Sequence, residues 1–114
     1  MIVKRASLTP LEFEDLRIFD YTAGKDLSSS LAVIEVPPQV RHAEAWSKRS
    51  DKYYFVTGGE IRFVLDGAPT ILYAGDVCFV RRGQRFSYSN DSAGPATLVL
   101  FHTPPFDIAE EVFV

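Results

Sequence analysis

Short runs of β-forming residues follow one another along almost the whole chain, and turn signals separate them at intervals of roughly eight to twelve residues. Asp66-Gly67 is a strong hairpin signal, because both of its positions tolerate positive φ. The runs predict strands over residues 16–21, 30–36, 52–57, 60–65, 69–73, 77–80, 85–89 and 96–102. Only the segment 107–114 reads as briefly helical. Many short strands with so little helix predict an all-β fold, either a sandwich or a barrel.

A chain of 114 residues with 46% hydrophobic and 24% charged residues is expected to form one globular domain. Cys78 is the only cysteine, so no internal disulfide is possible, and its apolar run 77–80 favours a buried structural thiol. No segment has the length or apolarity of a membrane span, and the first residues lack a cleavage pattern. The expected location is the cytoplasm.

Charge is distributed unevenly around a net value of −3. The stretch from Arg41 to Arg85 holds eight basic and five acidic residues, whereas the rest of the chain holds four basic and ten acidic ones. An acidic protein with a basic centre is a poor nucleic-acid binder and a reasonable host for a small anion. We therefore expect a small ligand that carries a carboxylate or a phosphate, and neither a nucleic-acid nor a membrane partner.

Two glycines and an asparagine stand in a fixed pattern within "GDVCFVRRGQRFSYSN", residues 75–90. The spacing of Gly75, Gly83 and Asn90 resembles the second conserved motif of the cupin family, G(x)5PxG(x)2H(x)3N. Arg81 replaces the proline of that motif, and Phe86 replaces its histidine. The retained positions shape tight turns, and the lost histidine is one that binds metal.

An upstream segment is similar to the first cupin motif. His42-x-Glu44 resembles its HxH opening, and Lys52 stands where the family has a glutamate. The interval after Glu44 is longer than in the family, and we expect an inserted loop over 45–51. The resemblance covers residues 30–107 and implies one RmlC-like cupin domain over 1–114, a double-stranded β-helix or jelly-roll barrel. It also implies a homodimer, in which the N-terminal residues 2–8 pack across the partner.

His42 and Glu44 are two residues apart on an expected strand, so both side chains should project to the same face. In a cupin that face is the barrel interior. One interpretation is a hydrogen-bonded polar pair with Phe86 filling the space beside it. A second makes His42 a general acid or base with Glu44 as its partner, as in the metal-independent epimerase branch of the family, which also uses a tyrosine. Candidates for the tyrosine are Tyr53, Tyr54, Tyr73 and Tyr88.

A third interpretation is a rebuilt site for a divalent metal, with His42, Glu44 and His102 as ligands. Lys52 and Phe86 offer no lone pair at the other two expected positions, so a metal is not the preferred prediction. Lys52 either forms an internal salt bridge with Glu44 or extends to solvent. If it faces inward, Lys52 with Arg62 or Arg85 would bind a carboxylate or phosphate.

Trp46, in the expected loop, either packs beneath that loop or closes over a ligand. The predicted ligand-binding residues are Trp46, Lys52, Tyr54, Arg62, Arg85, Phe86, Tyr88 and His102. Three function classes remain open. We rank a small-molecule-binding protein without catalysis first, a metal-independent isomerase- or epimerase-like enzyme that uses His42 second, and a metallo-cupin third.

Overall fold

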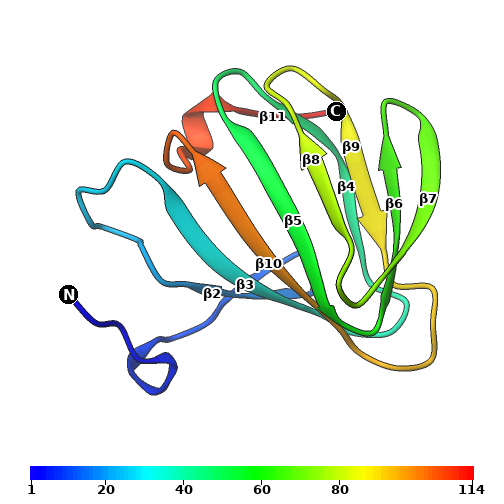
Figure 1. The fold of residues 1–114 in the computed structure, drawn as a ribbon, viewed down its shortest axis with the longest axis horizontal. Coiled ribbons are helices and arrows are strands. Elements are labelled where there is room, and N and C mark those ends of the chain that lie inside the picture. The colour runs from blue at the N-terminus through cyan, green and yellow to red at the C-terminus, as the bar shows by residue number, and fades with distance from the viewer.

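The computed structural model describes all residues, 1–114, as two antiparallel sheets that face each other in a jelly-roll barrel (Figure 1). The six-stranded sheet has the order β1 (Leu11–Phe13), β2 (Leu16–Asp20), β3 (Ser30–Val36), β10 (Ala96–Thr103), β5 (Asp51–Gly58) and β8 (Val77–Val80). The five-stranded sheet has the order β11 (Glu111–Phe113), β4 (Arg41–Ser47), β9 (Phe86–Ser89), β6 (Glu60–Leu65) and β7 (Ala68–Tyr73). The all-β prediction is confirmed.

The two remaining elements are single 3-10 turns, η1 (Arg5–Ser7) and η2 (Ile108–Glu110), and no helix could cross a membrane. All eight predicted strands form, and three of them keep their predicted bounds. The helical interpretation of 107–114 is wrong after its first turn, because β11 pairs with β4. The predicted loop over 45–51 is also partly wrong, since β4 continues to Ser47 and includes Trp46.

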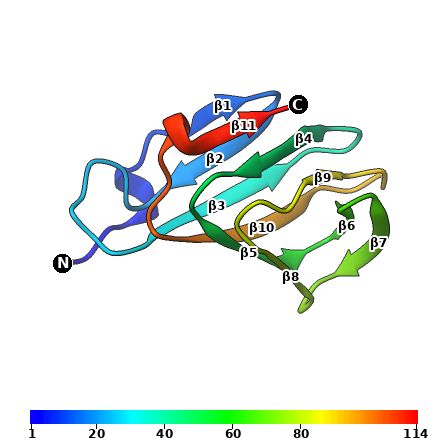
Figure 2. The ribbon, with the colours of Figure 1, turned by 90° about the horizontal axis from the view of Figure 1, so that it is seen from above.

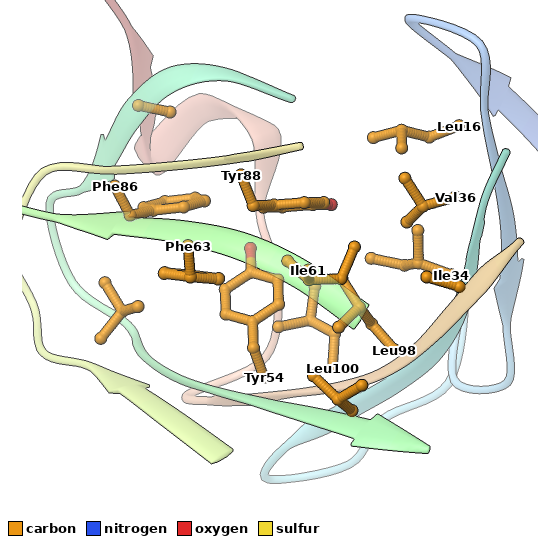
Figure 3. Close-up of a cluster of buried hydrophobic side chains, with 14 residues drawn as sticks. Leu16, Ile34, Val36, Tyr54, Ile61, Phe63, Phe86, Tyr88, Leu98 and Leu100 are labelled. Atoms are coloured by element: carbon orange, nitrogen blue, oxygen red, sulfur yellow. The ribbon is translucent and has the colours of Figure 1, made fainter. Parts of the chain in front are cut away.

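The core lies between the sheets, where alternate residues of each strand point inward. Along β10, every second residue from Ala96 to His102 is buried. Figure 3 shows the rings of Phe86 and Tyr88 side by side above Tyr54. The ring centroid of Tyr54 lies 5.4 Å from both. Phe86 is 1% exposed, so the prediction that its ring fills the interior is confirmed.

The spaced glycines and the asparagine of residues 75–90 have structural roles. Gly75 and Gly83 have φ values of 98° and 85°, which side chains with a Cβ rarely adopt. Asn90 is fully buried, and its amide nitrogen donates to the carbonyls of Val36 (2.9 Å) and Gly94 (2.8 Å). Its amide oxygen accepts from the backbone and hydroxyl of Ser92. The asparagine therefore ties the end of β9 to β3 and to the loop before β10.

Candidate functional site: a cavity between the sheets

A cavity of about 290 Å³ lies inside the barrel, a size suited to a small molecule. Of its 21 lining residues, 15 are hydrophobic. They come from both sheets and from both ends of the chain, with Phe13 on β1 and Phe113 on β11. The ring centroids of these two phenylalanines are 5.6 Å apart. Figure 2 shows β1 and β11 side by side, at the edges where the two sheets meet.

His42 reaches the cavity, but Glu44 does not. The pairing of β4 with β9 shifts register between His42 and Ala45, so a β-bulge resets the alternation of side chains. The side chain of Glu44 is 45% exposed, and its carboxylate lies 3.7 Å from Arg85 on the outside of the barrel. The prediction that His42 and Glu44 share one face is therefore wrong, and they do not form a pair.

The imidazole of His42 has a defined orientation. It stacks on Tyr88, with centroids 5.0 Å apart, and on Phe86 at 5.3 Å. Its Nδ1 lies 2.6 Å from the carbonyl oxygen of Ala43, and because a carbonyl only accepts, Nδ1 carries the proton. Burial lowers the pKa of His42, which keeps the ring neutral near pH 7 and leaves a lone pair on Nε2.

Two tyrosines line the same cavity. Burial raises the pKa of both Tyr54 and Tyr88, so both hydroxyls stay protonated at neutral pH and can donate hydrogen bonds. The hydroxyl of Tyr88 is buried and has no hydrogen-bond partner in the protein. A buried polar atom without a partner is rare in folded proteins, and this one belongs to a residue that lines the cavity.

Lys52 is buried on β5, and it forms an ion pair with Glu111 of β11. Both side chains are only 4% exposed. The predicted pair with Glu44 is therefore wrong, since Glu44 lies outside. Burial lowers the pKa of Lys52, and the hydrogen bond to Glu111 opposes that shift. The Lys52 ammonium also lies 4.6 Å from the ring centroid of Phe86.

His102 projects inward from β10 and lines the cavity. It is 4% exposed, and its Nε2 is the second buried polar atom without a partner in the protein. Burial, together with the positive charge of Lys52, lowers the pKa of His102 to about 3. The ring is therefore neutral at physiological pH. Its edge-to-face neighbour is Phe106, with centroids 5.3 Å apart.

Three of the predicted ligand-binding residues do not line the cavity. Trp46 is half-buried and pairs with Val112 of β11, and Arg62 is exposed on β6. Arg85 contacts Glu44 at the surface. Alternation along β6 could have indicated the outward position of Arg62, since its neighbours Ile61 and Phe63 are buried. Sequence reasoning missed Glu111, Phe13 and Phe113, because they lie on short strands at the chain ends.

The donor set does not fit a metal ion. No three side chains of His, Cys, Asp or Glu lie close enough together to hold one. The proposed set of His42, Glu44 and His102 is not assembled, because Glu44 projects outward. Phe86 and the Lys52 ammonium occupy the interior instead, and neither can coordinate a cation.

Similar solved structures share this fold over most of their length. Pac13, a nucleoside dehydratase from Streptomyces, is 22% identical, with a TM-score of 0.86 over 100% of this chain and 90% of that one. Variants of it with one histidine-to-glutamine or one tyrosine-to-phenylalanine change were solved with uridine. A predicted oxalate decarboxylase from Thermotoga maritima is 18% identical, with a TM-score of 0.84 over 91% of this chain and 99% of that one. KdgF from Halomonas sp. is 11% identical, with a TM-score of 0.82 over 93% of this chain and 94% of that one.

At these identities the similarity establishes the fold alone. A search of curated proteins found no match. The sequence profile of the cupin domain matches residues 32–102, which is more than half of the 114 residues. The chain therefore belongs to the cupin family.

Proposed function

We propose that this protein binds a small, uncharged organic molecule with a few hydrogen-bonding groups inside its barrel. The observation that supports the proposal is the pair of buried atoms without partners, the Tyr88 hydroxyl and the Nε2 of His102, on residues that line one apolar cavity. Leaving such a group unsatisfied costs about 1–3 kcal/mol. A ligand that accepts from Tyr88 and bonds His102 would offset that cost.

The charges around the cavity favour a neutral ligand over the carboxylate or phosphate expected from the sequence. Lys52 is compensated by Glu111, while Arg62 and Arg85 lie outside. Asp20 adds a further carboxylate to the lining. An anion would therefore meet no uncompensated positive charge in an apolar, weakly screening environment.

The Streptomyces neighbour gives the first compounds to test. Its variants were solved with uridine, a neutral molecule that combines a planar ring with hydroxyl groups. The lining of this cavity offers matching contacts, with several aromatic rings around His42 and hydroxyl donors on Tyr54 and Tyr88. We propose nucleosides and similar neutral ring compounds as the ligand class.

Acid–base chemistry on the bound molecule is the second candidate function. The neutral His42 has its proton on Nδ1 and a free lone pair on Nε2, which is the arrangement of a general base. Nε2 would accept a proton from a substrate C–H bond, and the Tyr54 or Tyr88 hydroxyl would donate to the oxygen on which negative charge develops. This chemistry needs no metal.

Titration calorimetry with a panel of nucleosides, matched nucleotides and simple carboxylates tests the binding proposal. We expect saturable binding of a neutral member, weakened roughly three- to tenfold in Tyr88→Phe, which removes about one hydrogen bond. Glu44→Gln, on the outer surface, is the matched control and should bind as the wild type does. Binding of the anionic members alone, or of none, would contradict the proposal. Turnover that is lost in His42→Gln with binding retained would favour the catalytic candidate.

We further propose that the protein partner is a second copy of this chain. The outer face of the six-stranded sheet carries two cross-strand rows of apolar residues. They are Phe101, Tyr53 and Phe79 in one row, and Val33, Val99, Phe55 and Val77 in the other. Tyr53 and Phe79 are 38% and 58% exposed in the single chain. An exposed apolar face of this kind suits a symmetric contact between two copies of the chain. The N-terminal turn packs within its own chain, where Arg5 lies over Phe19 and pairs with Glu35.

A further inference from the structure

The β-bulge in β4 leaves the backbone of Ala43 outside the regular ladder between β4 and β9. Both of its polar groups have side-chain partners instead. The Ala43 carbonyl accepts from Nδ1 of His42 at 2.6 Å. The Ala43 N–H donates to the carboxylate of Glu14 at 3.3 Å. Residue 43 is thus held on one side by the imidazole and on the other by an acidic side chain from the β1–β2 turn.

That turn has an unusual composition for its conformation. Glu14 and Asp15 have φ values of 51° and 66°; aspartate is common in this region, but glutamate is not. A strained backbone conformation of this kind tends to occur where it positions a functional group. Here the hairpin brings two groups to His42 at once. The ring centroid of Phe13 lies 6.0 Å from that of the His42 imidazole, and the Glu14 carboxylate accepts from the N–H of the next residue, Ala43.

Other elements around His42 offer no equivalent carboxylate. β9 contributes the rings of Phe86 and Tyr88, and β11 contributes Phe113. Lys52 of β5 lowers the pKa of His42, and Glu111 of β11 raises it, but these two are paired with each other. Glu14 raises the same pKa, and it forms no ion pair.

We propose that Glu14 is the positioning residue of this site: it anchors the Ala43 backbone so that the Ala43 carbonyl holds His42 in the Nδ1–H tautomer, with Nε2 free as the proton acceptor. The inference rests on the proposed function for its purpose, since a fixed tautomer matters only if Nε2 bonds or deprotonates a ligand. Glu14 takes the partner role that the sequence assigned to Glu44, and it acts through the backbone rather than by touching the ring.

Nitrogen-15 NMR of the imidazole in the ligand-free protein tests the proposal, because the two ring nitrogens report which of them carries the proton. We expect the wild type to show the Nδ1–H form as the main neutral species. Glu14→Ala removes the anchor and should give a mixture of tautomers. Glu14→Gln keeps an oxygen acceptor but removes the charge, so it should retain the tautomer while the midpoint of the His42 titration moves to lower pH. This conservative variant also covers the case in which the alanine variant does not fold.

Asp15→Asn is the matched control, because it removes one charge from the same turn and asparagine tolerates positive φ. Its His42 spectrum should match that of the wild type. An unchanged tautomer in Glu14→Ala, or an Asp15→Asn midpoint shift as large as that of Glu14→Gln, would overturn the proposal. These spectra are recorded without ligand. A failure of the nucleoside titrations would therefore refute the proposed function and leave the positioning result standing, and the reverse also holds.

Discussion

Replacing Lys52 with methionine removes the positive member of the buried ion pair that joins β5 to β11. Methionine has a similar length and no charge, so the Glu111 carboxylate remains at an interior position where only 4% of its side chain is exposed. Breaking a buried pair in this way typically costs about 3–5 kcal/mol, because one charge is left without compensation. That is a large share of the roughly 5–15 kcal/mol by which a domain is stable.

Urea denaturation and differential scanning calorimetry measure the effect. For a domain of this size, a loss of about 3–5 kcal/mol corresponds to a fall in Tm on the order of 10–25 °C. The double variant Lys52→Met/Glu111→Leu removes both charges and should recover most of the lost stability, since an apolar replacement of a buried pair is often neutral. Glu44→Gln breaks the exposed pair with Arg85 and should change stability by less than about 1 kcal/mol.

A loss of less than about 1 kcal/mol in Lys52→Met would refute the reasoning, because it would mean that the pair is well hydrated in solution. A double variant as unstable as Lys52→Met would also refute it. In that case the cost would come from lost packing around Phe86 and not from an uncompensated charge.

Three further outcomes are expected. The pKa of His102 is about 3 in the folded chain and 6.5 as its ordinary value, so the unfolded chain binds this proton first as the pH falls. The free energy of unfolding therefore decreases between pH 6.5 and pH 3. His102→Gln should lose less stability over this range in urea denaturation recorded at each pH. A parallel pH dependence in the variant would contradict this. Asn90→Ala deletes the buried amide that bonds Val36, Gly94 and Ser92, and it should lower the free energy of unfolding by about 2–4 kcal/mol. A loss below about 1 kcal/mol would mean that water replaces these hydrogen bonds in the variant. The proposed contact between two copies predicts that the wild type sediments as a dimer and the double variant Tyr53→Ser/Phe79→Ser as a monomer. Equal sedimentation coefficients would exclude this face as the contact.

The strands could be predicted because their signals are local. Alternation of apolar residues and the turn at Asp66-Gly67 are enough for β6 and β7, which form the predicted hairpin. The spacing of Gly75, Gly83 and Asn90 likewise predicted the family and the inward position of Phe86. Each of these features depends on residues close together in the chain.

The partners within the site could not be predicted, because they depend on contacts between distant segments. The bulge that separates His42 from Glu44 has no marker such as a glycine between them. Glu111 is 59 residues from Lys52, and its strand exists only because β4 offers an edge to pair with. Strand propensity of three residues is too weak to identify β1 or β11 before the barrel is assembled.

The cupin profile begins at residue 32 and ends at residue 102, so Phe13, Glu14, Glu111 and Phe113 all lie outside it. His42, Tyr54 and Tyr88 thus lie in the segment that matches the family profile, whereas Phe13, Glu14, Glu111 and Phe113, which surround the site, lie in the segments before and after it. Substitutions at Phe13 or Phe113, in the segments that flank the profile, are therefore expected to change which ligands the barrel accepts while the strands within residues 32–102 stay as they are. Grafting both ends onto a related barrel should carry ligand preference with them.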